Sequence, residues 1–128
     1  MRILLDTHVL LWALASPKQL GKGGRAAIED PANEVLFSAA SIWEIAIKAA
    51  LKRTDFRVSP DEITVAAIES GFKELPVYSA AAAHTAKLPA HHRDPFDRLL
   101  IAQAITEPAV FYTADAQLEV YSELVHRL

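Results

Sequence analysis

Short apolar runs alternate along this chain with longer segments whose apolar residues follow the spacing of a helix. The runs at residues 3–5, 34–38 and 110–113 have the length and composition of buried strands. Parallel strands need a crossover connection, usually a helix, whereas antiparallel strands can be joined by a tight turn. The alternation therefore predicts an α/β fold with a mainly parallel sheet that helices cover on both faces.

The bounds of several elements follow from capping and breaking residues. A helix is predicted over residues 95–106, because Asp94 is a good N-cap, Pro95 suits the first helical position and Pro108 stops the helix. The other expected elements are helices at 9–15, 25–29, 41–52 and 60–70, a loop at 21–24, an edge strand at 73–77, an alanine-rich helix capped by Ser79, a short helix opened by Asp115 and a final strand at 124–126.

Composition and charge narrow the class of protein. The 128 residues suggest one domain spanning residues 1–128, and the 52% apolar content argues against disorder. The chain has no cysteine, which excludes disulfides, thiolate catalysis and zinc–thiolate sites and suits a reducing compartment, so we expect the cytoplasm. No apolar stretch reaches the roughly 18 residues of a membrane span. A net charge of −3 argues against a broadly basic surface, although Lys48, Lys52, Arg53 and Arg57 form a local run that could hold phosphate groups.

Four acidic residues take similar positions relative to the predicted elements. Asp6 ends the first strand, and Asp115 follows the strand at 110–113. Glu44 and Asp97 each lie one turn into a predicted helix. In an open parallel sheet, ligands bind in the crevice outside the carboxyl ends of the strands. The four carboxylates are therefore expected to converge at that edge.

Each of these acids also has a purely structural explanation. Asp6 and Asp115 can cap helices, and Ser41 with Glu44 matches a capping box. Asp97 in a first turn suits the helix dipole. One cap contributes only about 1 kcal/mol, however, and four carboxylates at one edge would repel one another and raise their pKa values. A divalent cation that prefers oxygen ligands, such as Mg²⁺ or Mn²⁺, removes this repulsion.

Four motifs, in this order, carry a resemblance to a known family: "LLDTH" at the start, then "SAASIWEIAIK", "HRDPFDRLLIAQA" and "YTAD". They resemble the PIN-domain ribonucleases, above all the VapC-type toxins of bacterial toxin–antitoxin pairs. The resemblance implies a three-layer α/β/α sandwich, a Mg²⁺-dependent endoribonuclease acting on RNA, a homodimer and an antitoxin partner. It places the acidic site on Asp6, Glu44, Asp97 and Asp115, with Thr113 as the small hydroxyl residue two positions before the last acid.

Different roles are expected within this site. Mg²⁺ usually binds few carboxylates directly and keeps several waters. Two of the acids are therefore expected to bind the metal directly, and we expect these to be Asp6 and Asp97. Glu44 and Asp115 would orient metal-bound water or accept the proton of the attacking one. Asp94 is expected to cap its helix and so to aim the Asp97 ligand.

Arg98 is expected to support that cap, because it lies four residues beyond Asp94 and could pair with it. Two alternative functions stay open at this point, another metal-dependent α/β phosphohydrolase and a non-catalytic PIN-like interaction module. The sequence does not determine the RNA target, the number of metals, the antitoxin, or the roles of His8, His91 and His92.

Overall fold

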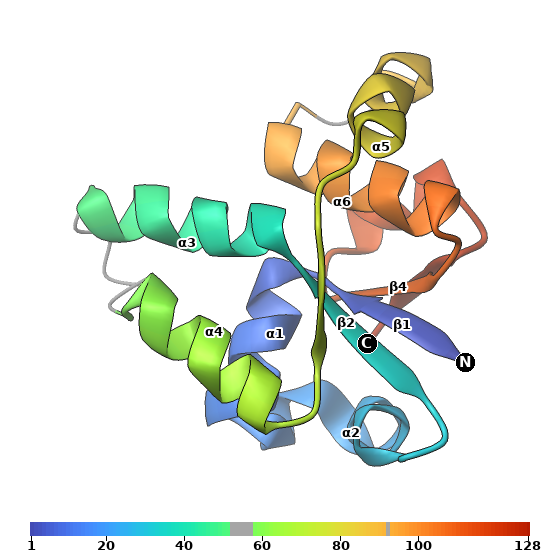
Figure 1. Ribbon diagram of the computed structural model, residues 1–128. Helices are drawn as coiled ribbons and strands as arrows, with labels where there is room; N and C mark the ends of the chain where they lie inside the picture. Colours follow the sequence, from blue (N-terminus) through green and yellow to red (C-terminus); the bar gives the residue numbers. More distant parts are fainter. Residues whose placement is uncertain (52–57, 92) are drawn as a thin grey trace.

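The computed structural model describes residues 1–51, 58–91 and 93–128 (Figure 1). Its strands are β1 (Arg2–Leu5), β2 (Glu34–Ser38), β3 (Lys73–Leu75), β4 (Val110–Thr113) and β5 (Val125–Arg127). Its α-helices are α1 (Thr7–Ala15), α2 (Gly21–Glu29), α3 (Ala39–Ala50), α4 (Pro60–Glu69), α5 (Ser79–His84) and α6 (Pro95–Thr106), with 3-10 helices η1 (Pro17–Leu20), η3 (Thr85–Lys87) and η4 (Ala116–Tyr121). None of the helices in these ranges is long and apolar enough to cross a membrane.

The described strands form one parallel sheet in the order β3-β2-β1-β4-β5. The chain extends the sheet from β1 through β2 to β3, and α5 and α6 then return it to the other side of β1, where β4 and β5 are added. The strand order therefore reverses between β1 and β4. In α/β proteins, ligands bind outside the carboxyl ends of the strands at such a point. The predicted α/β class with a parallel sheet is confirmed.

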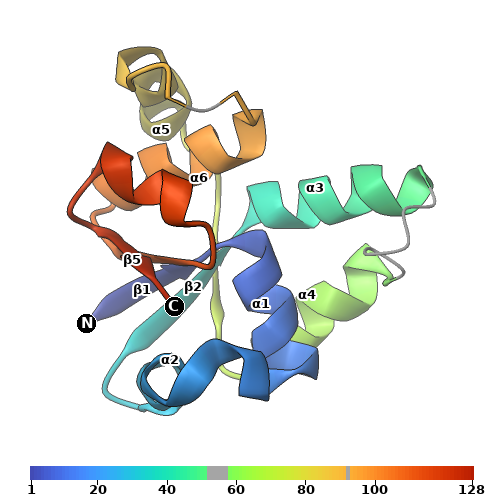
Figure 2. The same ribbon diagram turned by 180° about the vertical axis from the view of Figure 1, so that it is seen from behind.

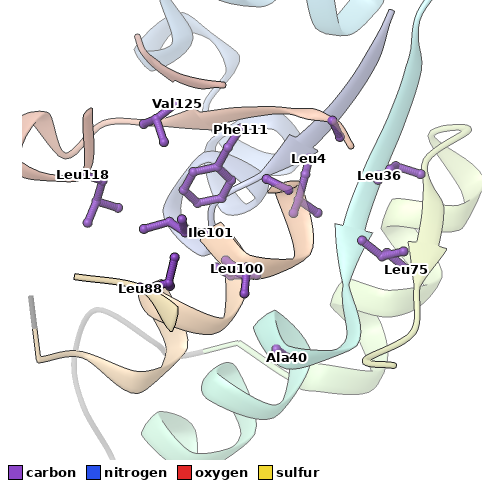
Figure 3. Close-up of a cluster of buried hydrophobic side chains, with 13 residues drawn as sticks. Leu4, Leu36, Ala40, Leu75, Leu88, Leu100, Ile101, Phe111, Leu118 and Val125 are labelled. Atoms are coloured by element: carbon purple, nitrogen blue, oxygen red, sulfur yellow. The ribbon is translucent and has the colours of Figure 1, made fainter. Parts of the chain in front are cut away.

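Side chains of β1 alternate between two hydrophobic clusters, one on each face of the sheet. Leu4 lies in the same cluster as Leu100 and Ile101 of α6 (Figure 3). Ile3 and Leu5 belong to the other cluster, which includes residues of α1, α2 and α4. Figures 1 and 2 show α5 and α6 on one side of the sheet and α1, α2 and α4 on the other. The fold is thus the expected three-layer α/β/α sandwich.

Helix α3 leaves the carboxyl end of β2 and contacts helices of both outer layers, α1 and α4 on one side and α6 on the other. The hydroxyl of Ser38 fixes its start by accepting from the amide of Ala40 at 3.0 Å and donating to Oε1 of Gln103 in α6 at 2.6 Å. Gln103 is buried, and its Nε2 also donates to the carbonyl of Pro76 at 3.2 Å. These bonds fix α3 relative to α6 at the edge where the acids are expected.

Residues 21–24 form the first turn of α2, so the predicted loop is wrong. Glycine costs up to about 1 kcal/mol in a helix, but burial of Leu20 and Ile28 around this segment offsets that cost. Gly21 has a φ of 73°, which glycine adopts without strain. A Cβ on Gly24 would lie 2.8 Å from Cδ2 of Leu128, so glycine allows the close packing of the last residue.

Two predicted caps are also wrong, whereas that of α6 is confirmed. Helix α3 is capped by Ser38, so Ser41 lies inside the helix and no capping box forms with Glu44. Helix α5 begins at Ser79 itself, after Tyr78. Asp94 caps α6, which spans the predicted residues.

Candidate active site

Asp6 lies at the carboxyl end of the central strand β1 and caps α1. Its amide donates to the carbonyl of Tyr112 at 2.9 Å, which extends the pairing of β1 and β4 up to the site. Its carboxylate accepts two hydrogen bonds, Oδ1 from the amide of Thr7 at 2.7 Å and Oδ2 from the hydroxyl of Thr113 at 2.6 Å. Only 8% of Asp6 is exposed, so the orientation of this carboxylate is fixed by its neighbours.

The hydroxyl of Thr113 connects Asp6 to the turn that carries Asp115. It is fully buried at the end of β4, and it accepts from the amide of Asp115 at 3.0 Å while donating to Asp6. Because a hydroxyl has only one proton, the donating amide leaves that proton for the carboxylate. Asp115 caps η4, with Oδ1 accepting from the amide of Gln117 at 2.9 Å. Thr113 therefore joins two of the four predicted acids.

Burial raises the pKa of the Asp6 carboxyl above its usual value near 3.8, because the charged form loses hydration. The hydrogen bonds from Thr113 and from the amide of Thr7 oppose this rise by stabilising the carboxylate. The charge of Glu44 adds to the rise, and His8 opposes it. A buried carboxylate whose pKa is raised in this way would be stabilised by a nearby cation.

Glu44 lies in the second turn of α3 and is 4% exposed. Its Oε1 accepts from the hydroxyl of Thr7 at 2.6 Å, and that hydroxyl also lies 2.9 Å from Oγ of Ser41. Its Oε2 pairs with Nζ of Lys48, one turn further along the helix, at 2.7 Å. Both carboxylate oxygens are therefore engaged. Instead of reaching back to the start of α3, as a capping box requires, Glu44 is directed toward α1.

Asp94 and Asp97 lie at the start of α6. Oδ1 of Asp94 accepts from the amides of Phe96 at 2.8 Å and Asp97 at 3.2 Å, which confirms its predicted capping role. Among the described residues no ion pair joins Asp94 to Arg98. The guanidinium of Arg98 instead donates to the carbonyls of Pro89 at 2.8 Å and Thr85 at 2.9 Å. The expected support of the cap by Arg98 is thus wrong, since this side chain ties α6 to the segment before it.

All four predicted acids line one cavity of about 460 Å³ at the carboxyl edge of the sheet. Its described lining comprises Asp6, His8, Trp12, Glu44, Lys48, Asp94, Asp97, Ala114 and Asp115. A larger cavity of about 600 Å³ lies toward the opposite edge, beside the end of α2, and contains none of the predicted site residues. The smaller cavity is the better candidate because it lies where the strand order reverses and collects the acids.

The side chains of this cavity suit a hydrated divalent cation. Within the part of the chain that the structure describes, no three acidic or histidine side chains form a compact metal-ligating group. Mg²⁺ does not need such a group, because it keeps several waters and binds through one or two carboxylates. The facing donors are mostly carboxylate oxygens, which Mg²⁺ and Mn²⁺ prefer. Together with the buried, hydrogen-bonded Asp6, this donor set fits the expected metal.

Three residues make contacts in the site that were not expected from the sequence, although Ser41 and Lys48 had been named there for other roles. Thr7 bridges α1 to Glu44, and Ser41 lies against the same hydroxyl. The signal for Thr7 was its position directly after Asp6 at the end of an apolar strand, where a polar side chain needs a partner. Lys48 pairs with Glu44, and their spacing of four residues on one helix face is a recognisable sign of such a pair.

The histidines and the basic run are less well connected to the cavity. His8 is exposed at its wall, with its ring centroid 6.5 Å from that of Trp12. His91 packs edge-on against Tyr121 at 5.5 Å. Of the predicted basic run, Lys48 lines the cavity. One of the histidines, His92, lies outside the described residues, as do the other members of the basic run, Lys52, Arg53 and Arg57.

Comparisons with known proteins agree with this architecture. The PIN domain family model matches residues 3–124. Ribonuclease VapC22 of Mycobacterium tuberculosis (strain ATCC 25618 / H37Rv) is 31% identical over 117 residues, which cover 91% of this chain and 88% of that relative. A chain in the crystal structure of VapBC2 from Rickettsia felis bound to a DNA fragment from their promoter has a TM-score of 0.69 at 14% identity, covering 98% of this chain and 96% of that one.

The strand order of the parallel sheet reverses between β1 and β4, and we call this place the switch point. The sheet and the carboxylate-lined cavity at its switch point define an α/β protein with an acidic site. The family model matches nearly the whole chain and the relative from M. tuberculosis is similar over almost its full length. The chain therefore belongs to the PIN-domain family, and the resemblance to its VapC-type members is confirmed.

The raised pKa of Asp6 should make stability depend on pH. Ionisation of a group with a higher pKa in the folded protein costs folding free energy, so the cost is absent below about pH 4 and grows as the pH rises through the folded pKa. Without divalent metal, we expect Asp6→Asn to be at least as stable as the wild type at neutral pH. The difference in the free energy of unfolding should shift in favour of Asp6→Asn as the pH rises. Urea unfolding with a chelator across this range measures the difference.

Thr113→Val is the matched variant for this experiment, because it removes a hydrogen bond that lowers the pKa of Asp6. It should lose more stability than the wild type over the same rise in pH. If the wild type instead became more stable relative to Asp6→Asn as the pH rises, Asp6 would be stabilised as a carboxylate without any metal.

Proposed function

We propose that this protein is a Mg²⁺-dependent endoribonuclease that hydrolyses RNA phosphodiester bonds and acts as the toxin of a type II toxin–antitoxin pair. The observation that carries the proposal is the convergence of Asp6, Glu44, Asp97 and Asp115 on one cavity at the switch point of the sheet. The relative from M. tuberculosis, a ribonuclease by name, supports the activity. The cytoplasm is the proposed compartment, since RNA is found there and the chain has no cysteine to oxidise.

Asp6 and Asp97 are the proposed direct ligands of Mg²⁺, for which Mn²⁺ could substitute. Asp6 caps α1 and Asp97 lies in the first turn of α6, and these two helices pack on opposite faces of the sheet. A cation between them would be held by two helix starts whose positions the core determines. The bound metal would lower the pKa of a coordinated water and neutralise charge that develops on the phosphate oxygens.

Glu44 and Asp115 take different parts in this proposal. Both oxygens of Glu44 are engaged, by Thr7 and by Lys48, so this carboxylate is suited to orienting a water in a fixed direction. Asp115 is only half-buried at the cavity wall, and its Oδ1 accepts from the amide of Gln117. Asp115 is therefore the better candidate to accept the proton of the attacking water.

The proposed protein partners are a second copy of the chain and an antitoxin. Large apolar side chains are exposed on α3 and α4, with Trp43 at 61%, Val65 at 54% and Ile68 at 56%. Exposed apolar surface of this kind is used in association. The similarity to a chain in the VapBC2 structure from R. felis supports an antitoxin partner. A basic side chain of that antitoxin could pair with the carboxylates in place of the metal.

The division of roles between Asp94 and Asp97 gives a direct test of the activity. We expect Asp97→Asn to abolish RNA cleavage while leaving the fold intact, because the amide keeps the size of the side chain but loses the charge that holds metal. Asp94→Asn is the matched control, and its loss should be mild since asparagine caps helices well. Cleavage of an unstructured RNA with Mg²⁺ and circular dichroism of both variants provide the measurements. Equal loss of cleavage at equal folding would contradict this division of roles.

Metal binding should be visible in thermal stability. A ligand that binds only the native state adds RT ln(1 + [L]/Kd), about 2.7 kcal/mol at a concentration of 100 Kd. We expect the melting temperature of the wild type to rise with Mg²⁺ or Mn²⁺, and the rise to shrink in Asp6→Asn. Asp30→Asn, at an exposed position beside the cavity toward the opposite edge, should keep the full rise. An unchanged melting temperature at millimolar metal would count against a preformed site.

The toxin role predicts an effect on growth. Expression of the wild type alone should slow growth of the native host, and co-expression with an adjacently encoded small protein should relieve the effect. Asp6→Asn should be harmless alone, because it lacks a metal ligand. Light scattering of the purified protein tests the homodimer in parallel. A harmless wild type that is also monomeric would instead favour a non-catalytic interaction module.

A further inference from the structure

Lys48 brings a positive charge to a cavity lined by five carboxylates. The other described residues that line this cavity include no lysine or arginine. Its Nζ lies 2.7 Å from Oε2 of Glu44, and its side chain is 22% exposed against 6% for that of Glu44. A pair this well buried is screened less by salt than one on the surface. The ammonium group is therefore held at the cavity wall.

The partner of Lys48 is itself fixed in position. Oε1 of Glu44 accepts from Thr7 at 2.6 Å, so the carboxylate cannot turn away from Lys48 without losing a second bond. An ammonium group has three N–H donors, so pairing with Glu44 does not by itself prevent a contact with an anion. Lys48 can therefore contact an anion in the cavity while it stays paired with Glu44.

An RNA strand entering this cavity would bring phosphates close to the carboxylates, and like charges repel strongly where water is partly excluded. A metal between Asp6 and Asp97 would offset that repulsion only near itself. Lys48 lies on a different element, α3, one turn beyond Glu44. It can thus attract a phosphate that the metal does not reach.

We propose that Lys48 binds a backbone phosphate of the RNA at the wall of the carboxylate cavity, with Glu44 holding its ammonium group in place. The inference rests on the proposed ribonuclease function and adds a substrate contact to it. The contact is with the backbone and not with a base, so it should contribute to affinity for RNA of any sequence.

Replacing Lys48 alone would leave the buried Glu44 without its cation and could unfold the protein. The test therefore starts from Glu44→Gln, which removes that charge and keeps an oxygen for Thr7. Glu44→Gln/Lys48→Met is compared with Glu44→Gln/Lys22→Met, which removes the same charge from an exposed position on α2. Binding of a short unstructured RNA is measured with a chelator between about 50 and 200 mM salt.

Loss of one phosphate contact to a single strand should reduce the slope of log K against log salt by about 0.7, equivalent to about fivefold weaker binding at 0.1 M salt. We expect this change for Lys48→Met and none for Lys22→Met in the Glu44→Gln background. An unchanged slope for Lys48→Met, or an equal change for Lys22→Met, would overturn the inference.

Cleavage by the wild type with Mg²⁺ separates this inference from the function on which it rests. If the wild type cleaves RNA but the slope is unchanged for Lys48→Met, the ribonuclease function is supported and the phosphate contact is contradicted. A changed slope in a protein that never cleaves RNA would support Lys48 as an RNA contact and contradict the proposed ribonuclease function.

Discussion

The buried carboxylate of Asp6 is the constraint on which the site depends. A charge that directly follows the buried apolar residues Ile3–Leu5 costs free energy unless it is hydrogen-bonded. The amide of Thr7 and the hydroxyl of Thr113 supply those bonds. One donor comes from the helix that follows β1 and the other from the neighbouring strand β4, so the carboxylate is satisfied only when β1 and β4 are correctly paired. The pKa of Asp6 is nevertheless raised, because burial and the nearby charge of Glu44 together outweigh these bonds and the effect of His8. The fold thus leaves a preference for positive charge at its switch point.

Much of this architecture was predictable because its signals are local. The apolar runs at β1, β2 and β4 and the bounds of α6 follow from short stretches, such as Asp94 and Pro95 before an apolar helix. The convergence of the acids could also be predicted from the sequence, because it needs only a parallel sheet in which the carboxyl ends of the strands share one edge. The motif resemblance then pointed to the same four acids.

What sequence reasoning missed depends on contacts between distant segments. The glycines before Ile28 join a helix because burial and the contact of Gly24 with Leu128 outweigh their low helical propensity. Glu44 is directed to Thr7, 37 residues away in sequence, instead of to the start of its own helix. Arg98 likewise prefers the carbonyls of the preceding segment to the carboxylate one turn earlier. Local spacing predicted a plausible partner in each case, and tertiary packing supplied a better one.

The spacing of the proposed metal ligands is a property of the core. Asp6 begins a helix that packs on one face of the sheet, and Asp97 belongs to a helix on the other face. No contact within a single helix can set the distance between them. It depends on how Leu4 packs against α6 and how Ile3 and Leu5 pack against the opposite layer. Protein interiors are close-packed, so a change of volume in either cluster is transmitted as a shift of its helix. The two clusters therefore determine whether one cation can reach both carboxylates, although neither contacts it.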